Sequence, residues 1–186
     1  MKKEIRILGI DDSPFDKFQD REVLVVGVLY RGGNYLDGVL STTVEVDGAD
    51  ATLKLMEMVN RSKFKPQLQC IMLDGISLGG FNVVNIGKLY RGTKIPVIVV
   101  MRDYPDVEKL FAALRKLNEL QKIQLIQKAG EVHRAGNVYI QVAGISVRDA
   151  QHIITLSATH SHIPEPLRVA HLIGAGMVSG ESRGRV

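Results

Sequence analysis

Three segments at the start of the chain have the composition of β-strands. Residues 5–10 and residues 22–30 are apolar and rich in β-branched side chains, as buried strands are. The turn Arg31-Gly32-Gly33-Asn34 follows the second segment and is a typical hairpin turn. Residues 35–46 alternate less cleanly but suit a third strand. The pattern therefore predicts an antiparallel meander of three strands.

After residue 46 the pattern changes to alternating helices and strands. Leu53, Leu55, Met56 and Val59 lie at helical spacing, with Asp50 as a candidate N-cap. Further strands are predicted at residues 70–73, 94–101 and 138–142, and further helices at residues 81–90, 106–117, 147–156 and 167–173. Residues 118–128 either continue the helix of residues 106–117 or form a second helix. This order predicts an α/β protein with a mixed sheet, in which the meander is followed by βα units and helices cover both faces. The ribonuclease H-like fold is the best-known arrangement of this order.

The length of 186 residues suits one domain, which we expect to span residues 1–174. Residues 175–186 are rich in Gly, Ser and Arg and are expected to form a mobile C-terminal tail. The chain has no apolar run long enough for a membrane helix and no pattern of a signal peptide. Its single cysteine excludes an intrachain disulfide. We therefore expect a cytoplasmic protein without a membrane partner.

The charge and the aromatic content narrow the class of partner. The net charge of +4 permits a nucleic-acid partner without requiring one. The absence of Trp, with only five Tyr and five Phe, argues against a broad platform on which single-stranded bases stack.

Carboxylates follow three of the predicted strands. Asp11 follows the first strand, Asp47 the third and Asp74 the fourth. If these strands lie side by side, two or three of the carboxylates can converge, and like charges in close proximity need a cation between them. Hard oxygen ligands suit Mg²⁺ or Mn²⁺, and a pair of such ions can support phosphodiester cleavage.

Two of these positions have an alternative candidate. Asp12 is a second candidate at the end of the first strand, and Glu45 or Asp50 at the end of the third. Any one of these carboxylates taken alone is more readily a turn or capping residue than a metal ligand. The metal-site hypothesis therefore depends on the set and not on a single member.

Glycines follow the fourth strand directly. Asp74 is succeeded by Gly75, Gly79 and Gly80, in a loop that can bend sharply or allow another molecule to approach the backbone. A carboxylate at the carboxyl end of a buried strand, followed by glycines, is where open α/β sheets place their sites. Asp74 as the cap of a turn or of the next helix is the simpler alternative.

Four motifs resemble a known family. They are GIDDSPF, VDGADAT, MLDGISLGGFNVV and IPEPLRVAHLI. The sequence resembles, over essentially the whole chain, the archaeal endonuclease dU family, which was first described as a domain of unknown function. That family is in turn similar to endonuclease V, a ribonuclease H-like and Mg²⁺-dependent nuclease that acts near deaminated bases.

The resemblance implies roles for individual residues. Asp11, in a Gly-Ile-Asp context, matches the first metal-binding Asp of endonuclease V, and Asp47 takes the place of its Glu in a Glu-Gly pair. Asp74 matches the Asp of its Asp-Gly element, although the His that follows there is absent here. The C-terminal motif is matched closely by residues 164–171, so that His171 is expected beside the metals as a ligand or proton carrier.

The same resemblance, with local sequence, suggests residues that touch the substrate. Candidates are Asp12, Gly75, Gly79, Gly80, Arg168, His160 and His162. Arg168 could hold a phosphate with both ends of its guanidinium, or could pair with Glu165 within the same helix.

The expected activity is metal-dependent cleavage of DNA, and possibly RNA, next to a deaminated base such as deoxyuridine, as in DNA repair. Two other classes stay open. One is a nucleic-acid-binding protein with the fold but no catalysis, and the other is a structural or regulatory protein whose acidic residues only cap turns and helices. The separation of Asp11, Asp47 and Asp74 in the folded chain distinguishes the last class from the first.

Overall fold

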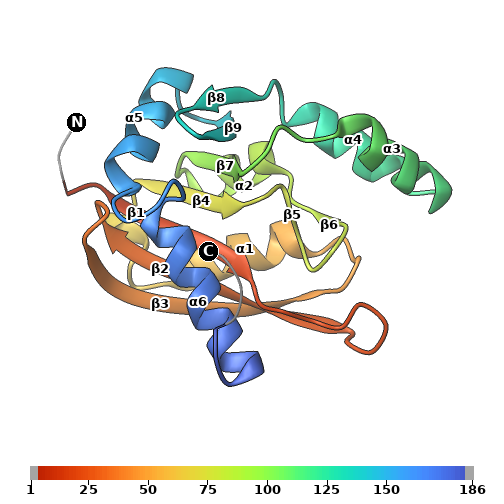
Figure 1. Cartoon of the computed structure of the whole chain (residues 1–186), viewed down its shortest axis with the longest axis horizontal. Helices are drawn as coiled ribbons and strands as arrows, with labels where there is room; N and C mark the ends of the chain where they lie inside the picture. The colour runs from red at the N-terminus through yellow and green to blue at the C-terminus, as the bar shows by residue number, and fades with distance from the viewer. Residues whose placement is uncertain (1–3, 183–186) are drawn as a thin grey trace.

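The computed structural model describes residues 4–182, which fold around a seven-stranded sheet with helices on both faces (Figure 1). The sheet contains β1 (Arg6–Asp12), β2 (Glu22–Arg31), β3 (Tyr35–Glu45), β4 (Cys70–Asp74), β7 (Val97–Met101), β8 (His133–Ala135) and β9 (Val138–Ala143). A separate ribbon pairs β5 (Ser77–Leu78) with β6 (Asn82–Val83). The helices are α1 (Ala51–Arg61), α2 (Ile86–Thr93), α3 (Val107–Lys116), α4 (Leu120–Lys128), α5 (Val147–Ser157) and α6 (Glu165–Ser179), with one 3-10 turn, η1 (Lys65–Gln67).

The sheet has the spatial order β3-β2-β1-β4-β7-β9-β8. Its first three strands form the antiparallel meander that the sequence predicts. β4 then pairs in parallel with the other side of β1, and β7 in parallel with β4. β9 is antiparallel to β7 and forms a hairpin with β8, a short strand that the sequence pattern did not indicate. Because β1, β4 and β7 run the same way, their carboxyl ends meet at one edge of the sheet.

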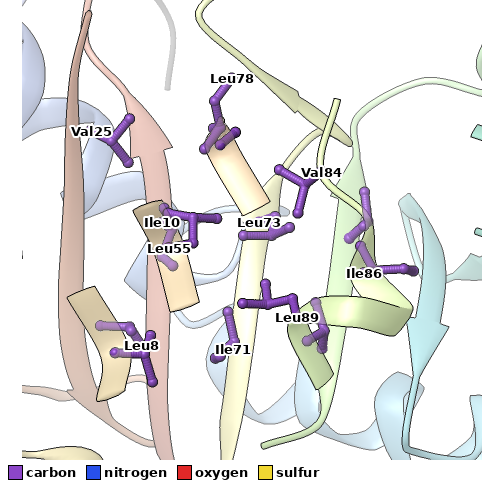
Figure 2. Packing of buried hydrophobic residues seen from close by; sticks show 14 of the residues in the cluster. Leu8, Ile10, Val25, Leu55, Ile71, Leu73, Leu78, Val84, Ile86 and Leu89 are labelled. Carbon is purple, nitrogen blue, oxygen red and sulfur yellow. The ribbon is translucent and has the colours of Figure 1, made fainter. Parts of the chain in front are cut away.

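The central strands are buried on both faces. Leu8 of β1 and Ile71 of β4 point to one face, where they pack with Leu55 of α1 and Leu89 of α2 (Figure 2). All four side chains have no exposed surface. Burial of each contributes about 1.5–3 kcal/mol to stability. Because the opposite face is buried as well, these strands are continuous apolar runs instead of an alternating pattern.

The opposite face is covered by α5 and α6. Ile7 and Met72 pack there with Ile153 of α5 and Leu167 of α6. Gly9 of β1 lies directly under the first turn of α6, where a Cβ atom would collide with the backbone of Pro166. The absence of a side chain at Gly9 therefore allows the backbone of α6 to lie close against β1.

One predicted helix begins later in the structure. The helix expected from residue 81 begins only at Ile86. Asn82 is instead part of the β5–β6 ribbon, and its side chain binds the segment that leads into α1. The Asn82 amide donates to the Glu45 carbonyl and to Asp50, and its oxygen accepts from the Ala51 N–H at the start of α1. Asp50 stands at the N-cap position of α1 without making the capping hydrogen bond.

The terminal helix is longer than predicted. α6 continues past Ile173 to Ser179 and ends at Gly180, which has a φ of 78°. Residues 175–179, expected in the tail, are therefore helical, and residues 183–186 of that tail lie outside the described range. Within residues 4–182, no helix is both long and apolar enough to cross a membrane.

Candidate functional site

The shared edge of β1, β4 and β7 carries a group of charged side chains. Asp11 and Asp12 are the last residues of β1, Asp74 is the last of β4, and Arg102 follows β7 directly. His171 reaches the same place from α6. These side chains line a shallow cavity of about 400 Å³ together with Ser13, Pro14 and Phe15. The edge therefore gathers three acidic groups, one imidazole and one guanidinium.

Asp11 is the most deeply placed of the carboxylates that line this cavity. It is 6% exposed. Its Oδ1 accepts a hydrogen bond from the Asp12 N–H at 3.0 Å, and its Oδ2 lies 3.0 Å from Nδ1 of His171. Burial raises the pKa of Asp11 to about 8, and the charges of Asp74 and Asp12 add to this effect. Asp11 and His171 are therefore joined by a hydrogen bond between β1 and α6.

Asp12 and Asp74 are held at the same edge by different partners. Burial raises the pKa of Asp12, and the Gly79 N–H, which donates to its Oδ2 at 2.8 Å, opposes that rise. Burial also raises the pKa of Asp74, whereas the positive charges of Arg102 and His171 lower it. Arg102 lies 4.0 Å from Asp74 Oδ2. Burial in this cavity therefore raises the pKa of all three carboxyl groups.

The donor set fits a divalent cation in its chemistry. Asp11, Asp12 and Asp74 supply hard oxygen atoms, and a cation between them would oppose the repulsion that helps to raise the pKa of Asp11. Over residues 4–182, however, no three His, Cys, Asp or Glu side chains are gathered closely enough to form a metal site. Metal binding would thus require side-chain movements at this edge of the sheet.

Asp47 lies beside this cavity and not in its lining. It follows β3 in a turn, with a φ of 53°, and lines a neighbouring cavity with Lys17 and Arg21. Its Oδ1 accepts from the Phe81 N–H at 2.8 Å, and its carbonyl accepts from Lys122 Nζ at 2.7 Å. The structure thus gives Asp47 a role in holding the glycine loop, and its role as a metal ligand stays a prediction.

The glycine loop, residues 75–80, is hydrogen-bonded to Asp12 at the end of β1 and to Asp47 in the turn after β3. Gly75, Gly79 and Gly80 all have positive φ angles, of 80°, 56° and 84°. The Gly79 N–H donates to Asp12 Oδ2, and the Gly79 carbonyl accepts from the Asp47 N–H at 2.8 Å. A Cβ atom on Gly80 would collide with the Asp47 carboxylate. These glycines therefore have a structural role, because their backbone conformation allows one loop to bind both Asp12 and Asp47.

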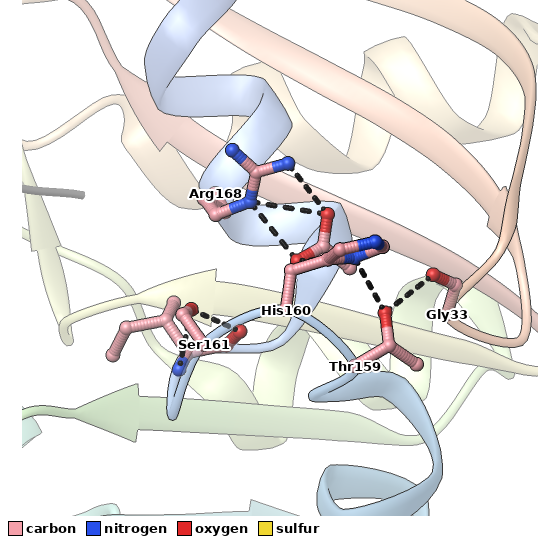
Figure 3. Close-up of polar contacts among 7 residues, drawn as sticks. Gly33, Thr159, His160, Ser161 and Arg168 are labelled. Atoms are coloured by element: carbon pink, nitrogen blue, oxygen red, sulfur yellow. Dashed lines mark hydrogen bonds and ion pairs between the residues drawn. The ribbon is translucent and has the colours of Figure 1, made fainter.

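Arg168 points to an internal partner (Figure 3). Its guanidinium binds the carboxylate of Glu165 at both ends, with Nε 2.9 Å from Oε1 and one terminal nitrogen 2.7 Å from Oε2. Glu165 is 1% exposed and also lies 3.5 Å from Nδ1 of His160. His162 instead contacts the Asn137 amide at 2.8 Å. None of Arg168, His160 and His162 lines the acidic cavity.

Two polar residues of the cavity, Arg102 and Ser13, were not singled out from the sequence. Arg102 follows a buried strand in the same way as Asp74, so its place after the third parallel strand was the available signal. Ser13 lines the cavity, and its buried Oγ has no hydrogen-bond partner within residues 4–182. No sequence signal marks that hydroxyl as unpaired.

The chain matches a family model, relatives of similar length and a solved structure. The family model described as endonuclease dU matches residues 3–178. A UPF0215 protein of Methanothermobacter thermautotrophicus is 52% identical over 189 residues, covering 99% of this chain and 93% of that protein. The crystal structure of a protein of unknown function from Archaeoglobus fulgidus has a TM-score of 0.88 and 46% identity, covering 94% of this chain and 99% of that one.

A more distant likeness extends to another enzyme. Ciona intestinalis endonuclease V, solved in complex with a 24mer DNA containing an inosine followed by a ribo-adenosine, has a TM-score of 0.57 and 14% identity. The match covers 90% of this chain and 83% of that chain. At this identity the likeness establishes the ribonuclease H-like fold of the nuclease, which is the fold that the sequence predicts.

Proposed function

The chain belongs to the endonuclease dU family, and we propose that it is a metal-dependent endonuclease that hydrolyses phosphodiester bonds near deaminated bases in DNA, with deoxyuridine as the first candidate. The observation that carries the proposal is the convergence of Asp11, Asp12, Asp74, Arg102 and His171 at one edge of the sheet. The DNA bound to the Ciona endonuclease V supports a nucleic-acid substrate for this fold.

We assign the cation, Mg²⁺ or Mn²⁺, to the oxygen atoms of Asp11, Asp12 and Asp74, with Asp47 as the further ligand that the sequence predicts. Such a cation lowers the pKa of a water molecule and stabilises a leaving oxygen. Because Asp11 and Asp74 come from adjacent parallel strands, their backbone spacing is fixed by the sheet. The fold therefore supplies a rigid base for these ligands.

We assign proton transfer to His171 and phosphate binding to Arg102. Asp11 holds His171 at Nδ1, which fixes the ring and leaves Nε2 as the atom that exchanges a proton with the substrate. Arg102 lies at the rim, with its side chain 41% exposed, where a guanidinium can bind a phosphate oxygen. We thus assign phosphate binding to Arg102 and not to Arg168, whose guanidinium is paired with Glu165.

A cleavage assay tests the proposal. Labelled duplexes that carry uracil, hypoxanthine or no lesion are incubated with Mg²⁺, Mn²⁺ or chelator, and matched RNA strands test the alternative substrate. Asp74→Asn removes the charge with little change in size, and Glu131→Gln, an exposed carboxylate far along the chain, is the matched control. Cutting that requires the lesion, the metal and Asp74 is expected.

Two results contradict the proposal. The first is cutting by Asp74→Asn at the rate of the wild type in saturating Mg²⁺. The second is binding of DNA without cutting under any metal condition, which would favour a nucleic-acid-binding protein that has no catalytic activity.

A further inference from the structure

The loop between β1 and β2 carries a phenylalanine that is not buried in the protein. Phe18 is 92% exposed, whereas Phe15 at the base of the same loop packs against the core. Figure 1 shows this loop, in red-orange, extending away from the ends of β1 and β2. A single exposed apolar side chain is common on protein surfaces, so its meaning depends on how the loop is built and on what lies beside it.

Hydrogen bonds within the loop hold Phe18 outward. The Phe18 N–H donates to Asp16 Oδ1 at 2.8 Å, and the Asp16 N–H donates to Asp20 Oδ2 at 2.7 Å. The Asp20 N–H returns to the Asp16 carbonyl at 2.8 Å. Both carboxylates of the loop are therefore used to close a tight turn, and the ring at its tip is presented to solvent by an ordered backbone.

The loop lies between the two acidic cavities. Its first part, including Ser13 and Phe15, lines the cavity of Asp11 and Asp74. Its second part, including Lys17 and Arg21, lines the neighbouring cavity with Asp47. Lys17 and Arg21 therefore bracket Phe18 along the chain, and both line this cavity beside the carboxylates of Asp20, Glu22, Glu45 and Asp47. They are the cations of this loop that can meet a phosphate backbone.

We propose that Phe18 stacks on a base of the bound nucleic acid, next to the phosphate held at the acidic edge, while Lys17 and Arg21 contact its backbone. The inference rests on the proposed function and adds a substrate contact to it. An aromatic side chain has few rotatable bonds and loses little entropy on binding, and an unstacked base offers a flat apolar surface whatever its identity. The loop thereby positions the strand relative to the carboxylates.

The absence of Trp from the chain gives a direct test. Phe18→Trp introduces the only Trp of the chain at the tip of the loop, and its emission can be excited apart from that of the five Tyr. Tyr35→Trp is the matched control, because Tyr35 is 62% exposed and pairs with Arg31 at the opposite edge of the sheet. Each variant is titrated with a uracil-containing duplex in chelator, and binding is followed independently by the anisotropy of a label on the DNA.

We expect the emission of Phe18→Trp to be quenched on binding and that of Tyr35→Trp to stay unchanged. Phe18→Ala should bind the same duplex about 5-fold to 100-fold more weakly than the wild type, whereas Tyr35→Ala should bind as the wild type does. In the presence of metal, the cutting rate of Phe18→Ala at low DNA concentration should fall by a similar factor.

The outcomes separate the two proposals. Normal binding and cutting by Phe18→Ala, together with unquenched Phe18→Trp, would overturn the stacking role and leave the nuclease intact; the exposed ring would then suit a protein partner. No anisotropy change and no cutting by the wild type would reject both proposals. Quenching at Phe18 without any cutting would support the contact and count against the nuclease.

Discussion

Replacing Asp11 by Asn tests the electrostatic state of the sheet edge. Burial, with the charges of Asp74 and Asp12, raises the pKa of Asp11 from 3.8 to about 8. Between these two values the folded protein keeps a proton that the unfolded chain has lost. The free energy of unfolding must therefore fall as the pH rises from about 4 to about 8, and this contribution is constant above that range.

The size of the effect follows from the two pKa values. Their difference corresponds to about 6 kcal/mol at most. Water that enters the shallow cavity and the bond to His171 both reduce the cost of the charge, so we expect about 2 kcal/mol to be realised. Asn has nearly the same shape and can still accept from the Asp12 N–H. Asp11→Asn should therefore be more stable than the wild type near pH 8 and similar to it near pH 4.

Denaturant unfolding of both proteins in chelator, at several values between about pH 4 and pH 9, measures this difference. Chelator is required because a bound cation would itself favour the ionised carboxylate. Glu131→Gln should retain the pH dependence of the wild type, since this side chain is exposed. An equal fall in stability for wild type and Asp11→Asn across that range would refute the reasoning, because the titrating group would then lie elsewhere.

Three further predictions concern packing, a buried ion pair and the metal. Gly9→Ala should lose about 2–3 kcal/mol of stability in denaturant unfolding because its Cβ collides with α6, whereas Gly176→Ala, with open space around it on α6, should gain about 0.5–1 kcal/mol. Arg168→Met should lose about 2–3 kcal/mol because it leaves Glu165 buried without its main partner, and adding Glu165→Gln should restore part of that loss. Mg²⁺ should raise the Tm of the wild type but not that of Asp74→Asn, as measured by thermal unfolding; equal shifts would place the metal elsewhere.

Parts of the site were accessible from the sequence. Asp11 and Asp74 could be assigned to strand ends because each follows an apolar run, and His171 because it lies in a motif that resembles a known family. The structure brings these three to one cavity. Arg102 was missed as a site residue although it also follows a strand, because a cation after a strand has no distinctive pattern on its own.

Other predictions depended on contacts that no local pattern reports. Arg168 looked equally suited to a phosphate and to Glu165, and only the burial of Glu165 in the fold favours the internal pair. Asp47 looked equivalent to Asp11 and Asp74. In the structure its carboxylate accepts a hydrogen bond from the Phe81 N–H, between residues 34 positions apart, and this bond depends on the shape of the glycine loop.

The sequence by itself determined the order of strands and helices, because apolar runs, turn residues and helical spacing act over a few neighbouring positions. It also determined the family and the carboxylates that stand at strand ends. The tertiary structure alone decided which of these groups meet. The parallel pairing of β1, β4 and β7 aligns their carboxyl ends, and the close approach of α6 over Gly9 brings His171 to Asp11. Both depend on contacts between distant segments, which the periodicity of a single segment does not encode.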